Sequence, residues 1–179
     1  LAVAKTESGA ALFVPVTGGA VKLAFDIAHL RGSQILTYER NEKGGAFLHV
    51  WDAESESWRQ VDVEDVAYEN AFAMNPSRTI VIGPPKGIPT SFAHALSGMP
   101  TVRQIPTLET AVVINKLHGV FNFSGSEWRW LADRHGLKLH DRNYERRRWG
   151  RYGAPDGKSK GLSHEKVVGS DTEMGSVEV

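Results

Sequence analysis

The sequence predicts an α/β fold, a three-layer arrangement with a mostly parallel sheet, flanking helices and a β-hairpin insertion. Two segments, at about residues 10–63 and 79–140, follow the same plan of apolar strand, glycine turn, helix and second strand. The first segment also carries a hairpin pattern. With 41% hydrophobic residues in 179, the chain has enough apolar side chains for one continuous core.

The first unit begins with an apolar strand from Leu12 to Val16 that stops at Thr17-Gly18-Gly19. Apolar residues then recur at helical spacing until Arg31-Gly32, which predicts a helix with a glycine cap. Residues 33–39 return as a second strand. In residues 44–63, alternation around a polar turn predicts a hairpin in which Trp51 and Trp58 pack together across the strands.

The second unit repeats this plan after a short helix expected at residues 64–73. A strand at residues 79–82 leads into Gly83-Pro84-Pro85-Lys86-Gly87, then a helix from about Thr90 and a strand at 101–105. Both predicted helices are led by an aromatic residue and closed by glycine, as FDIAHLRG and FAHALSG. We therefore expect two similar halves of one sheet, joined by right-handed crossovers that make their strands parallel.

The remaining elements complete the predicted domain. A helix is expected at residues 107–117, ended by His118-Gly119, and a capping box at Ser124 and Glu127 opens another. A short strand at 137–139 follows. The predicted boundaries are one α/β domain over residues 1–153 and a flexible tail over 154–179, which is rich in Gly, Ser, Lys and Glu.

Composition excludes several classes of function. Lys plus Arg equals Asp plus Glu at 21 each, so no overall charge draws the chain to nucleic acid or anionic lipid. Without cysteine, there can be no disulfide, zinc thiolate or thiol catalysis. No apolar run approaches the roughly 20 residues of a membrane span. The small-x-small pattern Ala2-Val3-Ala4 is typical of a signal-peptidase site, from which we expect export to the periplasm or cell surface.

The two glycine turns are the predicted ligand site, with Thr17, Gly18, Gly19, Gly83 and Lys86 as its candidate residues. A helix N-terminus preceded by glycine favours a phosphate, because its backbone N–H groups are exposed to the ligand. If both turns end adjacent parallel strands, they border the crevice where α/β sheets bind ligands. The alternative is that each turn is structural, and the two prolines of the second turn remove donors that a phosphate would need.

A basic, aromatic-rich segment follows the last predicted helix. Residues 127–152 hold eight Lys or Arg against four Asp or Glu, and the predicted basic patch within residues 142–152 comprises Arg142, Arg146, Arg147, Arg148 and Arg151. Arginines interleaved with Trp and Tyr can hold a nucleic-acid backbone and stack on bases. The alternative, which a neutral chain favours, is that the aromatics dock this segment onto the sheet.

No catalytic constellation is evident. There is no GxSxG or HExxH motif, and adjacent carboxylates such as Glu64 and Asp65 do not face each other on a helix. His135 and His140 straddle a helix end, which favours ordinary surface histidines over metal ligands. We therefore expect no catalytic residue, no metal and no cofactor.

Residues 79–117, TIVIGPPKGIPTSFAHALSGMPTVRQIPTLETAVVINKL, resemble the second half of the type 2 cell-wall-binding repeat. Val102-Arg103-Gln104-Ile105 and Thr110-Ala111 occupy the places of the family's strand end and next helix start. Two departures are that no Gly-x-x-Arg-Tyr precedes Thr110-Ala111 and no Asp-Ala-Leu follows Gly18-Gly19. The resemblance covers about half the chain, and it implies an α/β topology and a place in the cell envelope.

Three functional hypotheses follow. The first is a non-catalytic binding domain of a bacterial-type envelope or surface protein, whose partner is a glycan, polymer or protein. The second is a small-molecule or phosphate-binding α/β domain, with or without enzymatic activity, that uses the glycine turns. The third is nucleic-acid binding through residues 142–152, which the neutral composition disfavours.

Overall fold

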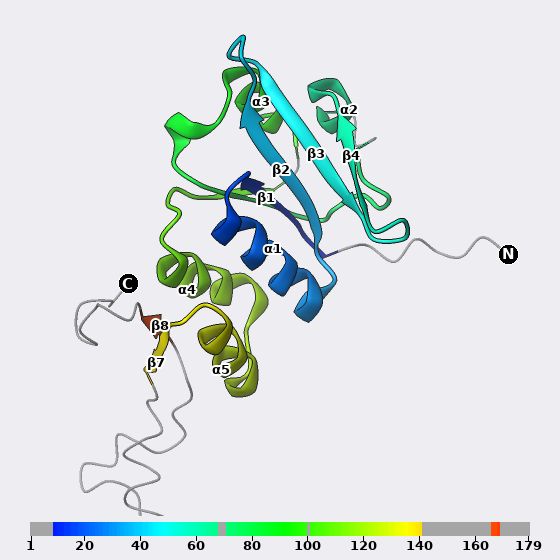
Figure 1. Ribbon diagram of the computed structural model, residues 1–179. Coiled ribbons are helices and arrows are strands. Elements are labelled where there is room, and N and C mark those ends of the chain that lie inside the picture. Colours follow the sequence, from blue (N-terminus) through cyan, green and yellow to red (C-terminus); the bar gives the residue numbers. More distant parts are fainter. Residues whose placement is uncertain (1–8, 68–70, 100, 141–165, 169–179) are drawn as a thin grey trace, which may run out of the picture. The chain divides into compact units, whose positions relative to one another are not determined.

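The computed structural model describes residues 9–67, 71–99, 101–140 and 166–168. The chain divides into two compact units, residues 1–108 and 109–179. The first unit holds a six-stranded mixed sheet in the order β4-β3-β2-β1-β5-β6 (Figure 1). Its strands are β1 (Ala11–Pro15), β2 (Gln34–Arg40), β3 (Ala46–Asp52), β4 (Ser57–Val61), β5 (Thr79–Ile82) and β6 (Val102–Ile105). The predicted α/β class is confirmed.

Four strands, β2, β1, β5 and β6, lie side by side in that order, and each is parallel to its neighbours in this set. Helix α1 (Gly18–Arg31) connects β1 to β2, and α3 (Thr90–Leu96) connects β5 to β6, so both predicted strand-helix-strand units are present. The first crossover leads outward from β1 and the second leads outward from β5 on the other side. The adjacent strands β1 and β5 are therefore the topological switch point of the sheet.

Helix α1 has the ends that its sequence predicts. The Thr17 hydroxyl accepts a hydrogen bond from the Ala20 backbone N–H at 3.4 Å, which satisfies one of the unpaired donors of the first turn. Gly32 ends the helix in the left-handed conformation at φ 66°, and its N–H donates to the Ala28 carbonyl. A glycine is favoured there because a side chain is strained at positive φ.

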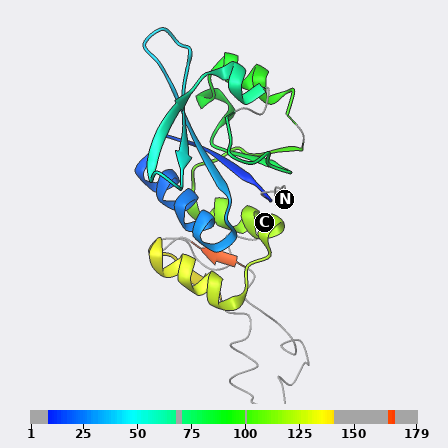
Figure 2. The same cartoon turned by 90° about the vertical axis from the view of Figure 1, so that its right-hand side faces the viewer.

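The two faces of the sheet are covered by different helices (Figure 2), which makes three layers. Because strand side chains alternate between faces, Phe13, Leu36 and Val81 lie on one face and pack with Val66 of α2 (Val63–Ala67) and Phe92 of α3. Helix α1 contacts β1 and β2 on the opposite face, which we call the α1 face. Its buried side chains include Leu23, Ala24 and Ile27. Among the described residues, no helix is long and apolar enough to cross a bilayer.

The predicted hairpin is confirmed, including its tryptophan pair. Strand β3 is antiparallel to both β2 and β4, and Trp51 lies directly opposite Trp58. Their ring centroids are 5.2 Å apart, and Phe25 of α1 meets both rings edge-on, at 5.0 Å from Trp51 and 5.8 Å from Trp58. Edge-to-face pairs of this kind stabilise by about 0.5–1.5 kcal/mol beyond the burial of area. The aromatic cluster therefore joins the hairpin to α1.

The helix predicted for residues 64–73 is found over Val63–Ala67 as α2, residues 68–70 lie outside the described residues, and the predicted end at residue 73 is wrong. Residues 71–74 form bends rather than a helix. Ala71 and Phe72 are buried in the core, and the Arg59 guanidinium donates to the Ala71 carbonyl. Core packing and this long-range hydrogen bond hold the segment in a path that local helix propensity does not predict.

The second unit contains α4 (Thr110–Phe121), α5 (Gly125–Arg134) and an antiparallel pair of short strands, β7 (Lys138–His140) and β8 (Lys166–Val168). The predicted capping box is confirmed, with hydrogen bonds from Glu127 N–H to the Ser124 hydroxyl and from Ser124 N–H to the Glu127 carboxylate. The predicted end of the preceding helix at His118-Gly119 is wrong. Helix α4 continues to Phe121, and Asn122 caps it at φ 52°.

Continuation of α4 has a visible cause. The His118 ring packs on Trp128 of α5 at 4.7 Å between centroids, and its Nδ1 accepts a hydrogen bond from the Phe123 N–H. These contacts outweigh the roughly 1 kcal/mol cost of a glycine within a helix. Strand β8 lies within the stretch predicted as a flexible tail, and the other residues of that stretch lie outside the described ones. The domain boundary at residue 153 stays a prediction.

Tyr38 and Gly83 form a tight junction at the ends of β2 and β5. The Tyr38 hydroxyl donates to the Ile82 carbonyl at 2.6 Å, and burial raises the pKa of Tyr38 to about 12. Gly83 has φ 127°, and a Cβ at this position would clash with the Tyr38 hydroxyl. Only glycine satisfies both conditions, because positive φ strains other residues and the hydroxyl leaves no room for a side chain.

We expect Gly83→Ala to lower the free energy of unfolding by about 2–4 kcal/mol, because it adds backbone strain and a steric clash. The matched control is Gly87→Ala, where φ is not positive and the nearest atom to a new Cβ lies at 3.8 Å. Urea denaturation of both variants beside the parent chain measures the difference. Equal stability of the two variants would contradict the account of this junction.

The raised pKa of Tyr38 makes stability depend on alkaline pH. In the unfolded chain a tyrosine loses its proton near pH 10, whereas the folded state holds it until about pH 12. The stability that Tyr38 contributes is therefore complete below pH 10 and is lost as the pH rises to 12. Urea denaturation at pH 8 and pH 11 should show a larger loss for the parent chain than for Tyr38→Phe. An equal loss would contradict the assignment.

Candidate functional site

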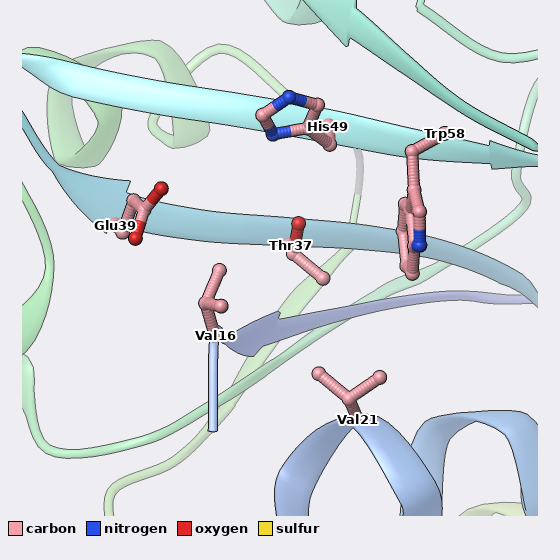
Figure 3. Close-up of a pocket in the computed structure, with 6 residues that line it drawn as sticks. All are labelled: Val16, Val21, Thr37, Glu39, His49 and Trp58. Atoms are coloured by element: carbon pink, nitrogen blue, oxygen red, sulfur yellow. The ribbon is translucent and has the colours of Figure 1, made fainter. Parts of the chain in front are cut away.

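A pocket of about 290 Å³ lies on the α1 face near the carboxyl ends of β1 and β2 (Figure 3). We call it the α1-face pocket. Its volume is at the lower end of the roughly 300–1,000 Å³ typical of ligand sites. The lining residues come from four elements and one turn: Val16, Val21, Thr37, Glu39, His49 and Trp58.

Strand register brings the polar lining residues together. Thr37 and Glu39 are two positions apart on β2, so both side chains lie on the same face. Thr37 is paired directly with His49 of β3. Trp58 of β4 is opposite Trp51, which is two positions beyond His49 on that same face. Three adjacent strands thus supply a hydroxyl, a carboxylate, an imidazole and an indole to one surface.

Apolar groups form the opposite side of the pocket. Val16 follows β1 and is 49% exposed, and Val21 lies at the start of the second turn of α1. Figure 3 shows both valines across from the strand residues. Trp58, which is 38% exposed, is held by its contacts with Phe25 and Trp51. A ring restrained in this way offers a preorganised surface, which reduces the entropy lost when a ligand binds.

The polar groups of the pocket have unused hydrogen-bonding capacity. Thr37 is only 4% exposed. Within the described part of the chain, the side chains of Thr37, Glu39 and His49 make no hydrogen bond or ion pair, and Trp58 makes ring contacts only. Buried polar groups in folded proteins nearly always have a partner. None of these four side chains has a polar atom that is buried without a partner, so water occupies their hydrogen-bonding positions until a ligand replaces it.

The side chains of the α1-face pocket are better suited to binding a ligand than to catalysing its reaction. Thr37 both donates and accepts, Glu39 accepts, the indole N–H donates, and the imidazole can do either according to its tautomer. An acid and a base are present as Glu39 and His49. A nucleophile activated by hydrogen bonding to either of them is not found among the described lining residues.

A second hollow lies on the other face, between the β4–α2 connection and α3. Its volume is larger, at about 940 Å³, and Asp62, Glu64, Ser91 and His94 contribute to its lining. These four side chains are exposed, so water satisfies them without a ligand. The α1-face pocket differs because Thr37 is buried within it.

The two predicted glycine turns do follow adjacent parallel strands. Thr17, Gly18 and Gly19 follow β1 and are exposed, whereas Gly83 follows β5 and is buried. The Gly83 N–H donates to the Ile105 carbonyl at 2.9 Å and is therefore engaged. Lys86 is exposed, and its carbonyl accepts a hydrogen bond from Arg40. A ligand role for these five residues stays a prediction.

The α1-face pocket adjoins the first predicted turn, because Val16 and Val21 flank it on either side. Gly83 and Lys86 do not contribute to its lining. The predicted basic patch, Arg142, Arg146, Arg147, Arg148 and Arg151, lies outside the described residues. Within the described part, no group of three His, Asp or Glu side chains is arranged to hold a metal ion.

Sequence reasoning missed the polar residues of the pocket. A signal was present, because Thr37, Glu39 and His49 alternate with the core residues Leu36, Tyr38, Leu48 and Val50. Alternation by itself is typical of a sheet with one face in water. Only the position of α1 on that same face shows that these polar groups line a pocket rather than an open surface.

No protein-family model, curated protein or solved structure matches this chain. The resemblance to the type 2 cell-wall-binding repeat therefore stays a prediction.

We expect Thr37→Val to change the free energy of unfolding by less than about 1 kcal/mol, because water reaches the Thr37 hydroxyl in the pocket. Thr79→Val is the contrasting variant: Thr79 is 1% exposed and its buried hydroxyl has no partner in the described structure, so its removal should leave stability unchanged or raise it by about 1 kcal/mol. Thermal and urea denaturation measure both. A clear loss of stability in Thr37→Val alone would mean that its hydroxyl is already satisfied.

Proposed function

We propose that this protein is a binding domain that holds a small ligand in the α1-face pocket. The observation that carries the proposal is the set of unpartnered polar side chains around the pocket, with Thr37 buried among them. The Thr37 hydroxyl is not one of the buried side-chain atoms without a partner, so water reaches it in the pocket. A ligand would replace that water and hydrogen-bond directly to the hydroxyl.

The position of the pocket supports the same proposal. Ligands of α/β sheets bind beyond the carboxyl ends of the strands, and the pocket lies at the ends of β1 and β2. It lies on the hairpin side of the β1–β5 switch point, because β3 and β4 extend the sheet there and supply His49 and Trp58. The hairpin insertion therefore has a use beyond packing.

A non-catalytic role in a bacterial-type cell envelope is the wider proposal. Its support is the sequence resemblance to the type 2 cell-wall-binding repeat. Nucleic-acid binding through residues 142–152 stays the second alternative, supported by charge and aromatic content alone. The pocket itself is compatible with either setting.

The proposal is tested by titrating the ¹⁵N-labelled protein with ligands of four classes: neutral sugars, sugar phosphates, organic ammonium ions and nucleotides. We expect one class to give saturable shifts at the Thr37 and His49 amides and the Trp58 indole N–H, and to raise the melting temperature by mass action. His49→Ala should weaken that binding. His94→Ala, in the hollow on the other face, should not.

Two outcomes would overturn the proposal. One is that no class shifts the resonances of Thr37, His49 and Trp58 at any concentration. The other is that binding depends on His94 and not on His49, which would place the ligand on the opposite face of the sheet.

A further inference from the structure

We infer that the ligand of the α1-face pocket carries a substituted organic ammonium group. This inference rests on the proposed function, because it names the chemistry of a ligand for the same pocket. Three features of the lining support it: the charge of Glu39, the aromatic surface of Trp58 and the apolar walls.

The charge of the lining residues favours a cation. Glu39 is the only Asp, Glu, Lys or Arg among the six residues that line the pocket. It is partly buried, and within the described residues it forms no ion pair. A partly buried carboxylate attracts a nearby cation more strongly than a fully solvated one does, because less water screens the pair. A positive group in the pocket would supply the missing partner, whereas a phosphate or carboxylate would be repelled.

The aromatic surface is the second argument. A cation over the face of an indole is attracted by the negative charge of the ring, and tryptophan gives the strongest such interaction. Trp58 contributes to the lining and forms T-shaped contacts with Phe25 and Trp51, at interplanar angles of 79° and 66°. These contacts restrain the Trp58 ring. Trp58 lies on the α1 face diagonal to His49, and Figure 3 shows Thr37 between Trp58 and Glu39 on the strand side of the pocket.

The valines are the third argument. Val16 and Val21 present alkyl groups to the pocket. An inorganic cation or a primary ammonium is strongly hydrated and binds to oxygen ligands or water, which these two side chains do not supply. Alkyl substituents on the nitrogen spread the charge and make apolar contacts with such walls. The N-terminus of α1 lies beside the pocket, since Val16 and Val21 flank its first residues, and its positive dipole opposes a cation. The full negative charge of Glu39 is larger than this partial charge.

The remaining polar groups suit the rest of such a ligand. Thr37 and His49 are paired across β2 and β3, and each can accept or donate a hydrogen bond. A ligand with a hydroxyl two carbons from its nitrogen would offer that hydroxyl to Thr37 or His49 while its ammonium group stays near Glu39. Choline has this composition and is a suitable probe.

The test compares choline with 3,3-dimethylbutan-1-ol, in which carbon replaces the charged nitrogen and the shape is nearly the same. Both are titrated into the full chain in phosphate buffer, because Tris is itself an organic ammonium ion. The shift of the Trp58 indole N–H reports binding. We expect choline to bind at least about tenfold more tightly than its neutral analogue.

Two variants assign the difference to the pocket. Glu39→Gln keeps the size of the side chain and removes its charge, and it should abolish the preference for choline while leaving the fold intact, since Glu39 makes no side-chain contact that holds the structure. Glu42→Gln is the matched control, because Glu42 is exposed in the turn after β2 and does not line the pocket.

The outcomes separate this inference from the function on which it rests. Equal affinity for choline and its neutral analogue, or a preference that survives in Glu39→Gln, overturns the ammonium inference. If a neutral sugar or a sugar phosphate shifts Thr37, His49 and Trp58 and choline does not, the inference fails and the binding function stands. If no ligand class shifts these three resonances, both the ammonium inference and the binding function fail.

Discussion

The register between β2 and β3 is the constraint on which the site depends. Because strand side chains alternate with a period of two, the pairing of Thr37 with His49 sends Leu36, Tyr38, Leu48 and Val50 to the other face. A slip of one residue would bury the carboxylate of Glu39 in the core and expose its apolar neighbours. The free energy of the core therefore selects the same register that assembles the pocket.

Two further contacts maintain the geometry around that register. Phe25, Trp51 and Trp58 connect α1 to the hairpin at one end of the pocket through ring contacts. Tyr38 ties β2 to the end of β5 through the Ile82 carbonyl, across the intervening β1. Strand ends that would otherwise fray are thus held at the edge of the sheet where the pocket lies. Rigid support of this kind is what a binding site needs.

The sheet also shows how an insertion can create a site. The parallel strands β2, β1, β5 and β6 lie side by side, and their switch point lies between β1 and β5. Adding the antiparallel strands β3 and β4 widens the α1 face beyond what α1 covers. The surface left between helix and hairpin becomes the pocket, lined on one side by Val21 and on the other by His49 and Trp58.

Local patterns predicted much of the fold because the physical causes are local. Glycine and threonine at the ends of α1, the Ser124 and Glu127 capping box, and the alternation that pairs Trp51 with Trp58 all act over a few residues. Predictions were wrong where distant contacts decide, as at Gly119, where His118 packs on Trp128 and the helix continues. The bends at residues 71–74, where a helix was predicted, have a similar cause in the burial of Ala71 and Phe72.

By itself, the sequence determined the α/β class, the two repeated units, the hairpin and the positions of the glycine turns, since these follow from periodicity and backbone sterics. Tertiary structure alone decided that Thr37, Glu39, His49 and Trp58 share one pocket. These residues come from three strands, and their proximity depends on strand order, register and the placement of α1. Those are set by the sum of many long-range contacts, which no short stretch of sequence contains.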